Sequence, residues 1–155
     1  MDIDYDLVFS QMREAFAIHE LILDSSGEAI DYRFLDLNPA FEEMTGLSKE
    51  AIVGKTVLEV LPGTEALWLD HYAKVVKSGG PRRFEAYTRP LDKWFAVSAF
   101  RVAEGCFATL FVDVTERKKL DEFRLATENK LRALNADLER MLEEKDSLVQ
   151  ESTRN

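Results

Sequence analysis

The sequence lacks several features that mark common functional classes. Its single cysteine, Cys106, excludes an internal disulfide or a thiolate zinc cluster. No apolar run approaches the roughly 18 residues that a membrane span needs, and the start Met1–Asp4 lacks the basic residues of a signal peptide. Basic side chains are also in deficit, 20 against 29 acidic, for a net charge of −9. We therefore expect a cytoplasmic protein that binds neither nucleic acid nor membranes.

Glycine, proline and aromatic residues are scarce in one part of the chain only. All 7 glycines, all 4 prolines and 15 of the 16 aromatic residues lie in residues 1–115, which can build a hydrophobic core. Residues 116–155 keep one aromatic residue, Phe123, and hold 10 acidic and 9 basic side chains. We therefore divide the chain into an N-terminal amphipathic helix in 1–14, a globular domain in 15–115 and a charged helix in 116–155.

Turn residues separate the globular domain into short elements. Runs of strand-forming residues predict five strands, at 16–24, 31–37, 83–89, 93–102 and 106–114. Helical spacing between capping residues and glycines predicts three helices, at 40–45, 49–53 and 64–78. This order predicts an α+β fold in which an antiparallel sheet of about five strands carries short helices on one face.

The charged helix carries a regular apolar stripe. Its members, interrupted by Thr127 and Lys145, follow one another at spacings of three and four residues: Leu120, Phe123, Leu131, Leu134, Leu138, Met141 and Leu148. A long stripe of this kind predicts a coiled coil, most simply with a second copy of the chain. The alternative is a solvated helix that packs back on its own domain. Parallel and antiparallel pairing both remain open.

Four motifs of the globular domain occur in a recognisable order. They are the segments DYRFLDLN at 31–38, NPAFEEMTG at 38–46, IVGK at 52–55 and FVDVTERK at 111–118. In this order they resemble a PAS domain, the sensory module of bacterial two-component kinases and cyclic-nucleotide signalling enzymes. The resemblance implies the PAS fold over residues 10–118. It also implies a C-terminal signalling helix and an output domain outside this chain. We expect a homodimer through the C-terminal helix and the N-terminal helix.

The junction between the globular domain and the helix contains no glycine or proline. Asp113 and Glu116 have the spacing of a capping box, and Thr115 is the alternative cap. A movement of the last strand would therefore pass into the helix without a hinge. The resemblance assigns signal coupling to Asp113, Thr115 and Glu116.

Catalytic motifs are missing from the sequence. The glycines are scattered, so no phosphate-binding loop is formed. The two histidines, His19 and His71, have no partner at metal-ligand spacing, and we expect neither a metal site nor an enzyme. A kinase or cyclase activity would belong to an output domain.

Cofactors of related PAS domains can be compared with this sequence. Flavin photochemistry needs a cysteine in the region that corresponds to Leu61–Leu67, where there is none, so flavin–cysteine chemistry is excluded. Haem-binding relatives use a histidine on the long helix of the domain, which makes His71 a candidate axial ligand. We favour the alternative that His71 is an ordinary helix residue that binds no ligand. His19 is expected to be a polar residue on a strand face.

A pocket for a small organic ligand is a further candidate site. Its expected walls are the aromatic and flexible apolar residues between sheet and helices: Phe34, Phe41, Met44, Leu61, Trp68, Tyr72 and Trp94. The alternative is a filled hydrophobic core.

The sequence thus predicts a PAS sensory and dimerisation module that couples ligand binding or association to its helix. A purely structural dimerisation module and a haem-based gas sensor are the rivals. The ligand and the output domain stay open, and we expect the chain to be a fragment of a longer protein.

Overall fold

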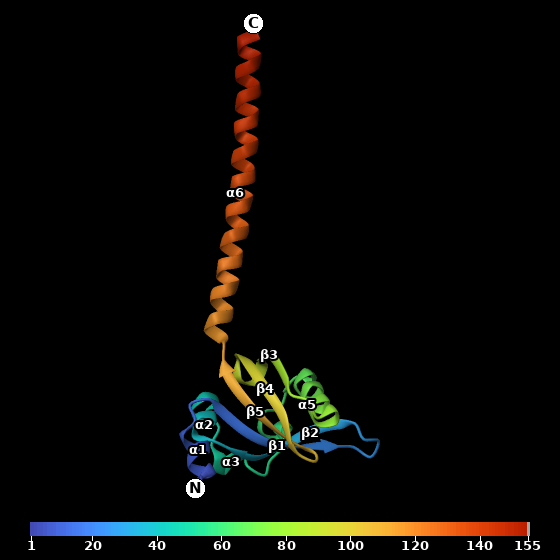
Figure 1. Ribbon diagram of the computed structural model, residues 1–155. Helices are drawn as coiled ribbons and strands as arrows, with labels where there is room; N and C mark the ends of the chain where they lie inside the picture. The colour runs from blue at the N-terminus through green and yellow to red at the C-terminus, as the bar shows by residue number, and fades with distance from the viewer. Residues whose placement is uncertain (155) are drawn as a thin grey trace. The chain divides into compact units, whose positions relative to one another are not determined.

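The computed structural model describes residues 1–154. The chain divides into two compact units, Met1–Thr115 and the residues from Glu116 onward, and each unit is described by itself. The first unit contains the sheet and all the shorter helices (Figure 1). The second unit is helix α6, which begins at Thr115 and runs to Arg154.

The described residues of the first unit form one five-stranded antiparallel sheet. Its strands lie in the order β2-β1-β5-β4-β3, so the first strand of the chain is paired with the last. The strands are β1 (Ala15–Leu23), β2 (Ala29–Leu37), β3 (Arg82–Thr88), β4 (Lys93–Ala103) and β5 (Cys106–Asp113). The predicted α+β fold is confirmed, and each strand boundary lies within two residues of its prediction.

Short helices begin where the sequence supplies caps. The side chains of Asp4, Asn38 and Ser48 each accept the N–H three residues on, as N-caps do. The helices of this unit are α1 (Tyr5–Gln11), α2 (Pro39–Thr45), α3 (Lys49–Ile52), α4 (Val57–Val60) and α5 (Ala66–Ser78), with a 3-10 turn η1 (Arg89–Leu91) after β3. Helix α4 was not predicted. It begins with a capping box between Thr56 and Glu59.

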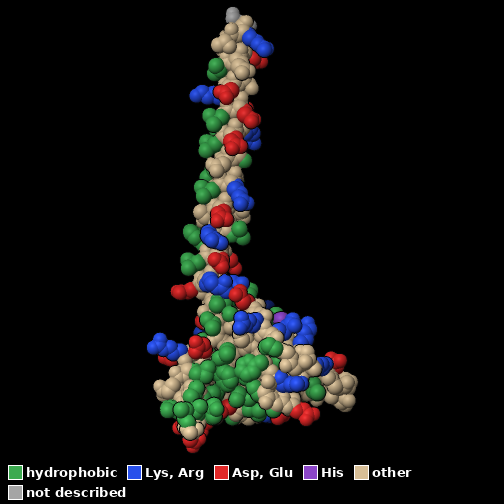
Figure 2. Space-filling model, viewed as in Figure 1, with side chains coloured by type: hydrophobic (Ala, Val, Ile, Leu, Met, Phe, Trp, Pro, Cys, Tyr) green, Lys and Arg blue, Asp and Glu red, His purple; other side chains and the backbone are tan. Residues whose placement is uncertain are grey.

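The two faces of the sheet have different neighbours. Helices α2 to α5 pack on one face and bury Phe41, Ile52, Val57, Trp68 and Tyr72 against it (Figure 1). The opposite face is also apolar but only half-buried. In the view of Figure 2, hydrophobic side chains gather over the part of this unit where Figure 1 draws the strands. Both faces of the central strands are therefore hydrophobic, and only the helix-covered face is closed to solvent.

Asn38 fixes helix α2 to the sheet. Its side chain is fully buried, and its Oδ1 accepts the backbone N–H groups of Phe16 at 2.9 Å and Phe41 at 3.1 Å. Its Nδ2 donates to the carbonyl of Glu14 at 3.0 Å. One side chain thus caps α2 and satisfies the backbone at the start of β1, which sets the position of the helix over the sheet.

Helix α6 has no buried residue of its own. The apolar stripe of the sequence is exposed along it, with Leu134 at 58% and Leu138 at 55% exposure (Figure 2). The Thr127 hydroxyl donates to the Phe123 carbonyl one turn earlier, at 2.9 Å. Within residues 1–154, no helix is both long enough and apolar enough to cross a membrane.

Candidate functional site

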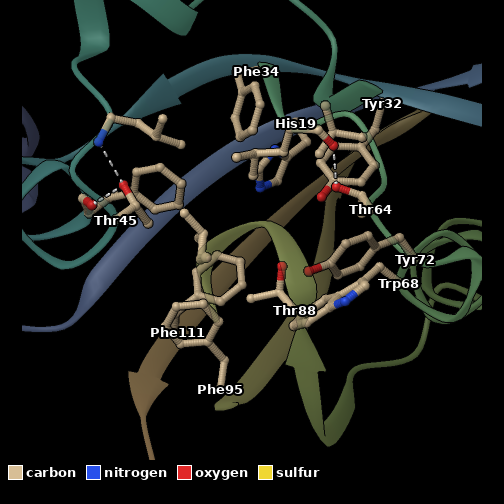
Figure 3. A pocket seen from close by; sticks show the side chains of 15 residues that line it. His19, Tyr32, Phe34, Thr45, Thr64, Trp68, Tyr72, Thr88, Phe95 and Phe111 are labelled. Carbon is tan, nitrogen blue, oxygen red and sulfur yellow. Dashed lines mark hydrogen bonds between the residues drawn. The ribbon is translucent and has the colours of Figure 1, made fainter. Parts of the chain in front are cut away.

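A small cavity lies between the inner face of the sheet and the helices (Figure 3). The centre of a water-sized sphere can occupy about 40 Å³ of it. Every strand and helices α2, α4 and α5 contribute to its wall, so the fold as a whole shapes it. The lining residues are His19, Tyr32, Phe34, Phe41, Thr45, Leu47, Val57, Leu61, Thr64, Trp68, Tyr72, Thr88, Leu91, Phe95 and Phe111.

His19 is the most unusual residue of this wall. Its side chain is 1% exposed, because it points from β1 to the helix-covered face and its ring lies 4.9 Å from that of Phe107 and 5.1 Å from that of Tyr32. Its Nε2 is 2.9 Å from the Thr109 hydroxyl, whereas its Nδ1 has no hydrogen-bond partner among the described residues. Burial lowers the pKa of His19 to about 3, so the imidazole is neutral at physiological pH.

Tyr72 brings a second unpaired polar atom to the same cavity. Its side chain on α5 is fully buried, its ring stacks on that of Phe107 at 4.5 Å, and its hydroxyl lacks a partner among the described residues. Burial raises the pKa of Tyr72 well above its ordinary value, and the neighbouring Tyr32 adds to the shift. In Figure 3 the Tyr72 and Thr88 hydroxyls point toward one another at one side of the cavity.

Three other polar side chains of the wall, those of Trp68, Thr45 and Thr64, have hydrogen-bond partners within the protein. The Trp68 indole donates to Glu65 at 3.2 Å, and the other carboxylate oxygen of Glu65 accepts the Arg89 N–H at 2.7 Å. The Thr45 and Thr64 hydroxyls donate to backbone carbonyls within their own turns. Among the described residues, the fully buried side-chain atoms without a hydrogen-bond partner are His19 Nδ1 and the Tyr72 hydroxyl oxygen.

Comparison with known proteins identifies the family. A sequence model described as the PAS fold matches residues 29–119, which is more than half of the chain. The chain belongs to the PAS family. No curated protein matches the sequence significantly.

Solved structures share the fold of this PAS domain at low sequence identity. An RNA-binding light-oxygen-voltage receptor is similar over 79% of this chain with a TM-score of 0.56 and 16% identity, and the chain spans only 36% of that receptor. A light-oxygen-voltage protein of Rhodobacter sphaeroides is similar over 70% of this chain and 63% of its own, with a TM-score of 0.50 and 20% identity. A domain of a sensory box sensor histidine kinase/response regulator from Geobacter sulfurreducens shows 21% identity, 70% and 90% coverage and a TM-score of 0.47. At these identities the likeness concerns the fold alone.

Five of the seven predicted pocket residues line the cavity of the PAS domain. They are Phe34, Phe41, Leu61, Trp68 and Tyr72. The other two predictions need correction. Met44 packs against the core without lining the cavity. Trp94 alternates with the inward-facing Phe95 on β4, so its side chain lies on the opposite face of the sheet.

Several lining residues were not predicted. His19 was expected only as a polar residue on a strand face, and the structure buries it on the inner face. Tyr32, Phe95 and Phe111 also escaped prediction. The motif at 31–38 contains Tyr32, and the inward-facing Phe34 two residues later could have indicated it by strand alternation.

Neither His71 nor Cys106 faces the cavity. The His71 ring stacks on Phe84 at 3.9 Å, and its Nδ1 accepts a hydrogen bond from Arg82 Nε at 2.8 Å. Burial lowers the pKa of His71, and the positive charge of Arg82 lowers it further. This arrangement does not fit an axial haem ligand of the cavity, which is itself far smaller than a haem.

Cys106 begins β5 away from the lining residues. Within residues 1–154, no cluster of three or more His, Cys, Asp or Glu side chains is placed to hold a metal ion.

The end of the PAS domain is tied to the start of β4. The Thr115 hydroxyl accepts the Trp94 N–H at 2.9 Å, and the Trp94 carbonyl accepts the Val114 N–H at 2.9 Å. The carboxylate of Asp113 accepts the Thr115 N–H at 3.0 Å, where a capping box with Glu116 was predicted. Lys93 donates to the Met44 carbonyl at the end of α2 at 2.6 Å and lies 4.0 Å from the Asp113 carboxylate.

Proposed function

We propose that this PAS domain is a sensory and dimerisation module whose input is a small molecule bound in the cavity between sheet and helices. One observation carries the proposal: His19 Nδ1 and the Tyr72 hydroxyl are buried, unpaired and on the wall of the same cavity. A buried polar group without a partner costs roughly 1–3 kcal/mol, so native proteins rarely leave two of them together. A bound molecule that pairs with both would recover this free energy.

The proposed output is helix α6, paired with its copy in a second chain. Its exposed stripe runs from Leu120 to Leu148. In a coiled coil, a stripe of this kind is buried against a partner helix, and this burial stabilises the pair. Helix α1 also buries no residue and exposes Tyr5, Leu7 and Val8. A homodimer through α6, extended by α1, would cover both surfaces.

The proposed coupling runs through Lys93. Helix α2 supplies Phe41 and Thr45 to the cavity wall, and its last turn is bonded to Lys93 through the Met44 carbonyl. Lys93 in turn lies beside Asp113, and the next residue, Trp94, is bonded to Thr115. A ligand that displaces α2 would therefore shift the segment that leads into α6. A kinase or cyclase domain that reads this shift would lie outside the chain, which we infer is not itself an enzyme.

The test is native mass spectrometry of the protein purified from cells, with the denatured mass as reference. A retained small molecule, reduced at least tenfold in occupancy in Tyr72→Phe, is the expected result. The matched control is Tyr87→Phe, because the Tyr87 hydroxyl lies outside the cavity and donates to the Asp92 carboxylate. This variant should keep the ligand. A protein that carries no extra mass and gains none from cell extract would support the rival, a structural dimerisation module with a filled core.

A further inference from the structure

The cavity wall carries no formal charge. Its fifteen residues include no lysine, arginine, aspartate or glutamate. The titratable members are His19, Tyr32 and Tyr72, and all three are neutral: burial lowers the pKa of His19 to about 3 and raises the pKa of both tyrosines. A carboxylate, phosphate or ammonium group in this cavity would lose its hydration without meeting an opposite charge, which is strongly unfavourable.

The hydrogen bonds of His19 indicate what its free nitrogen can do. The Thr109 hydroxyl has one proton and lies 2.9 Å from His19 Nε2 and 3.5 Å from the Ala17 carbonyl. If that proton goes to Nε2, the imidazole proton sits on Nδ1, which then donates; if it goes to Ala17, Nε2 donates to Thr109 and Nδ1 accepts. The Tyr72 hydroxyl is free to donate. The cavity thus offers one imidazole nitrogen on β1, which donates or accepts according to the tautomer, and one phenolic hydroxyl on α5.

A ligand hydroxyl has the matching chemistry, because it donates one hydrogen bond and accepts others. Apart from Tyr32 and three threonines, the remaining wall is aromatic or aliphatic and includes Phe34, Phe41, Phe95, Phe111 and Trp68. Such a wall favours an apolar, flat body attached to that hydroxyl.

We infer that the cavity binds small, uncharged hydroxyl compounds with an apolar or aromatic body, of which phenol is the simplest aromatic example. This inference rests on the proposed function, because it names the ligand class of that same cavity. The ligand hydroxyl bonds both His19 Nδ1 and the Tyr72 hydroxyl, donating to one and accepting from the other according to the His19 tautomer.

The size of the cavity limits the class to small molecules. The cavity volume of about 40 Å³ holds only a few water molecules, so a ring requires part of the wall to move outward. The half-buried Leu61 and Thr64 belong to the short connection between α4 and α5, whereas the strand residues are fixed by the sheet. Binding of phenol should therefore perturb residues 61–65 more than the strands.

The test compares three probes of similar size by isothermal titration calorimetry and by backbone NMR shifts. Phenol carries the hydroxyl, toluene lacks it, and benzoate adds a charge. We expect phenol to bind about tenfold more tightly than toluene and benzoate at least tenfold more weakly than phenol. Benzoate binding as tight as phenol binding, or equal affinity for phenol and toluene, would overturn the ligand class.

Two variants test the assigned contacts. Tyr72→Phe removes one oxygen atom and His19→Leu removes the imidazole nitrogen, so each should reduce the preference for phenol over toluene several-fold and leave toluene binding unchanged. Tyr87→Phe is the control and should keep the full preference. If His19→Leu does not fold, Tyr72→Phe decides alone, and an undiminished preference in it contradicts the inference.

The ligand class and the proposed function can fail separately. A charged molecule retained from cells would contradict the class while the sensory cavity stands. Toluene binding as tight as phenol binding would likewise contradict the ligand class but not the sensory cavity. If none of the three probes binds and no mass is retained from cells, both the class and the proposed cavity function are wrong.

Discussion

A buried neutral histidine makes the stability of this PAS domain depend on pH. The folded domain holds the pKa of His19 at about 3 because burial disfavours its charged form. In the unfolded chain the pKa returns to about 6.5, so below that pH the unfolded state binds a proton that the folded state does not. The stabilisation is fully present above pH ~6.5 and is lost as the pH falls toward 3. We expect a loss of ~2 kcal/mol between pH 7.5 and 5 from this residue alone.

Urea unfolding at these two pH values measures the effect. Between pH 7.5 and 5, the free energy of unfolding of His19→Leu should fall by ~2 kcal/mol less than that of the unaltered protein. This difference is expected whatever the stability of the variant at pH 7.5. The control is His71→Gln, because His71 is only partly buried and its removal should change the pH dependence less. An unchanged acid sensitivity in His19→Leu would show that other groups cause it.

The same residue shows where prediction from the sequence ends. On β1 the inward set Ala15, Ala17, His19 alternates with the outward set Phe16 and Ile18, and both sets are largely apolar. A strand with two apolar faces has no alternation from which the buried face can be identified. The strand itself was therefore predictable, whereas the burial of His19 was not. Trp94 was misplaced for the same reason, because its neighbour Phe95 is equally hydrophobic.

At the scale of elements, Asn38 holds helix α2 over the sheet. Replacement by alanine removes three hydrogen bonds and leaves the partly buried N–H of Phe16 without this acceptor. We expect Asn38→Ala to lower the free energy of unfolding by about 2–4 kcal/mol. Chemical denaturation measures the change. Asn129→Ala, on exposed α6, is the matched control and should leave the unfolding of the PAS domain unaltered.

Helix boundaries were predictable where a cap and a glycine stop occur together. Helix α2 has both in Asn38 and Gly46, and its prediction was correct to within one residue. Helix α4 has only four residues, and its signal is the single capping box Thr56-x-x-Glu59, which carries too little apolar periodicity to be noticed. The cavity residue Val57 was therefore missed together with its helix.

The Thr115 hydroxyl adds one hydrogen bond to the connection between β4 and the end of β5. Thr115→Val keeps the shape of the side chain but removes the acceptor for the Trp94 N–H. We expect the free energy of unfolding of the PAS domain to fall by about 1 kcal/mol, while Thr115→Ser, which keeps the hydroxyl, stays closer to the original. Thermal and urea unfolding give the comparison. Equal losses in both variants would contradict a role for this hydrogen bond.

At the scale of the whole molecule, the two units obtain their stability in different ways. Residues 1–115 bury a core that includes Leu37, Tyr72, Val75 and Phe107, all at most 1% exposed. Helix α6 buries nothing within its own chain, although its sequence supplies a stripe that a partner helix can cover. The sheet domain should therefore fold in a monomer, whereas α6 should depend on association.

Leu134→Glu separates these two kinds of stability. Leu134 lies in the centre of the apolar stripe and is 58% exposed in the single chain, so a charge there would be buried in a paired coil but harmless in an isolated helix. We expect the variant to weaken dimerisation at least a hundredfold in analytical ultracentrifugation and to lose helical signal in circular dichroism. The unfolding of the sheet domain should stay unchanged. Asn135→Glu places the same charge one residue away from the stripe and should remain dimeric. If Leu134→Glu dimerises as well as Asn135→Glu, the stripe is not the interface, and any dimer must form through another surface.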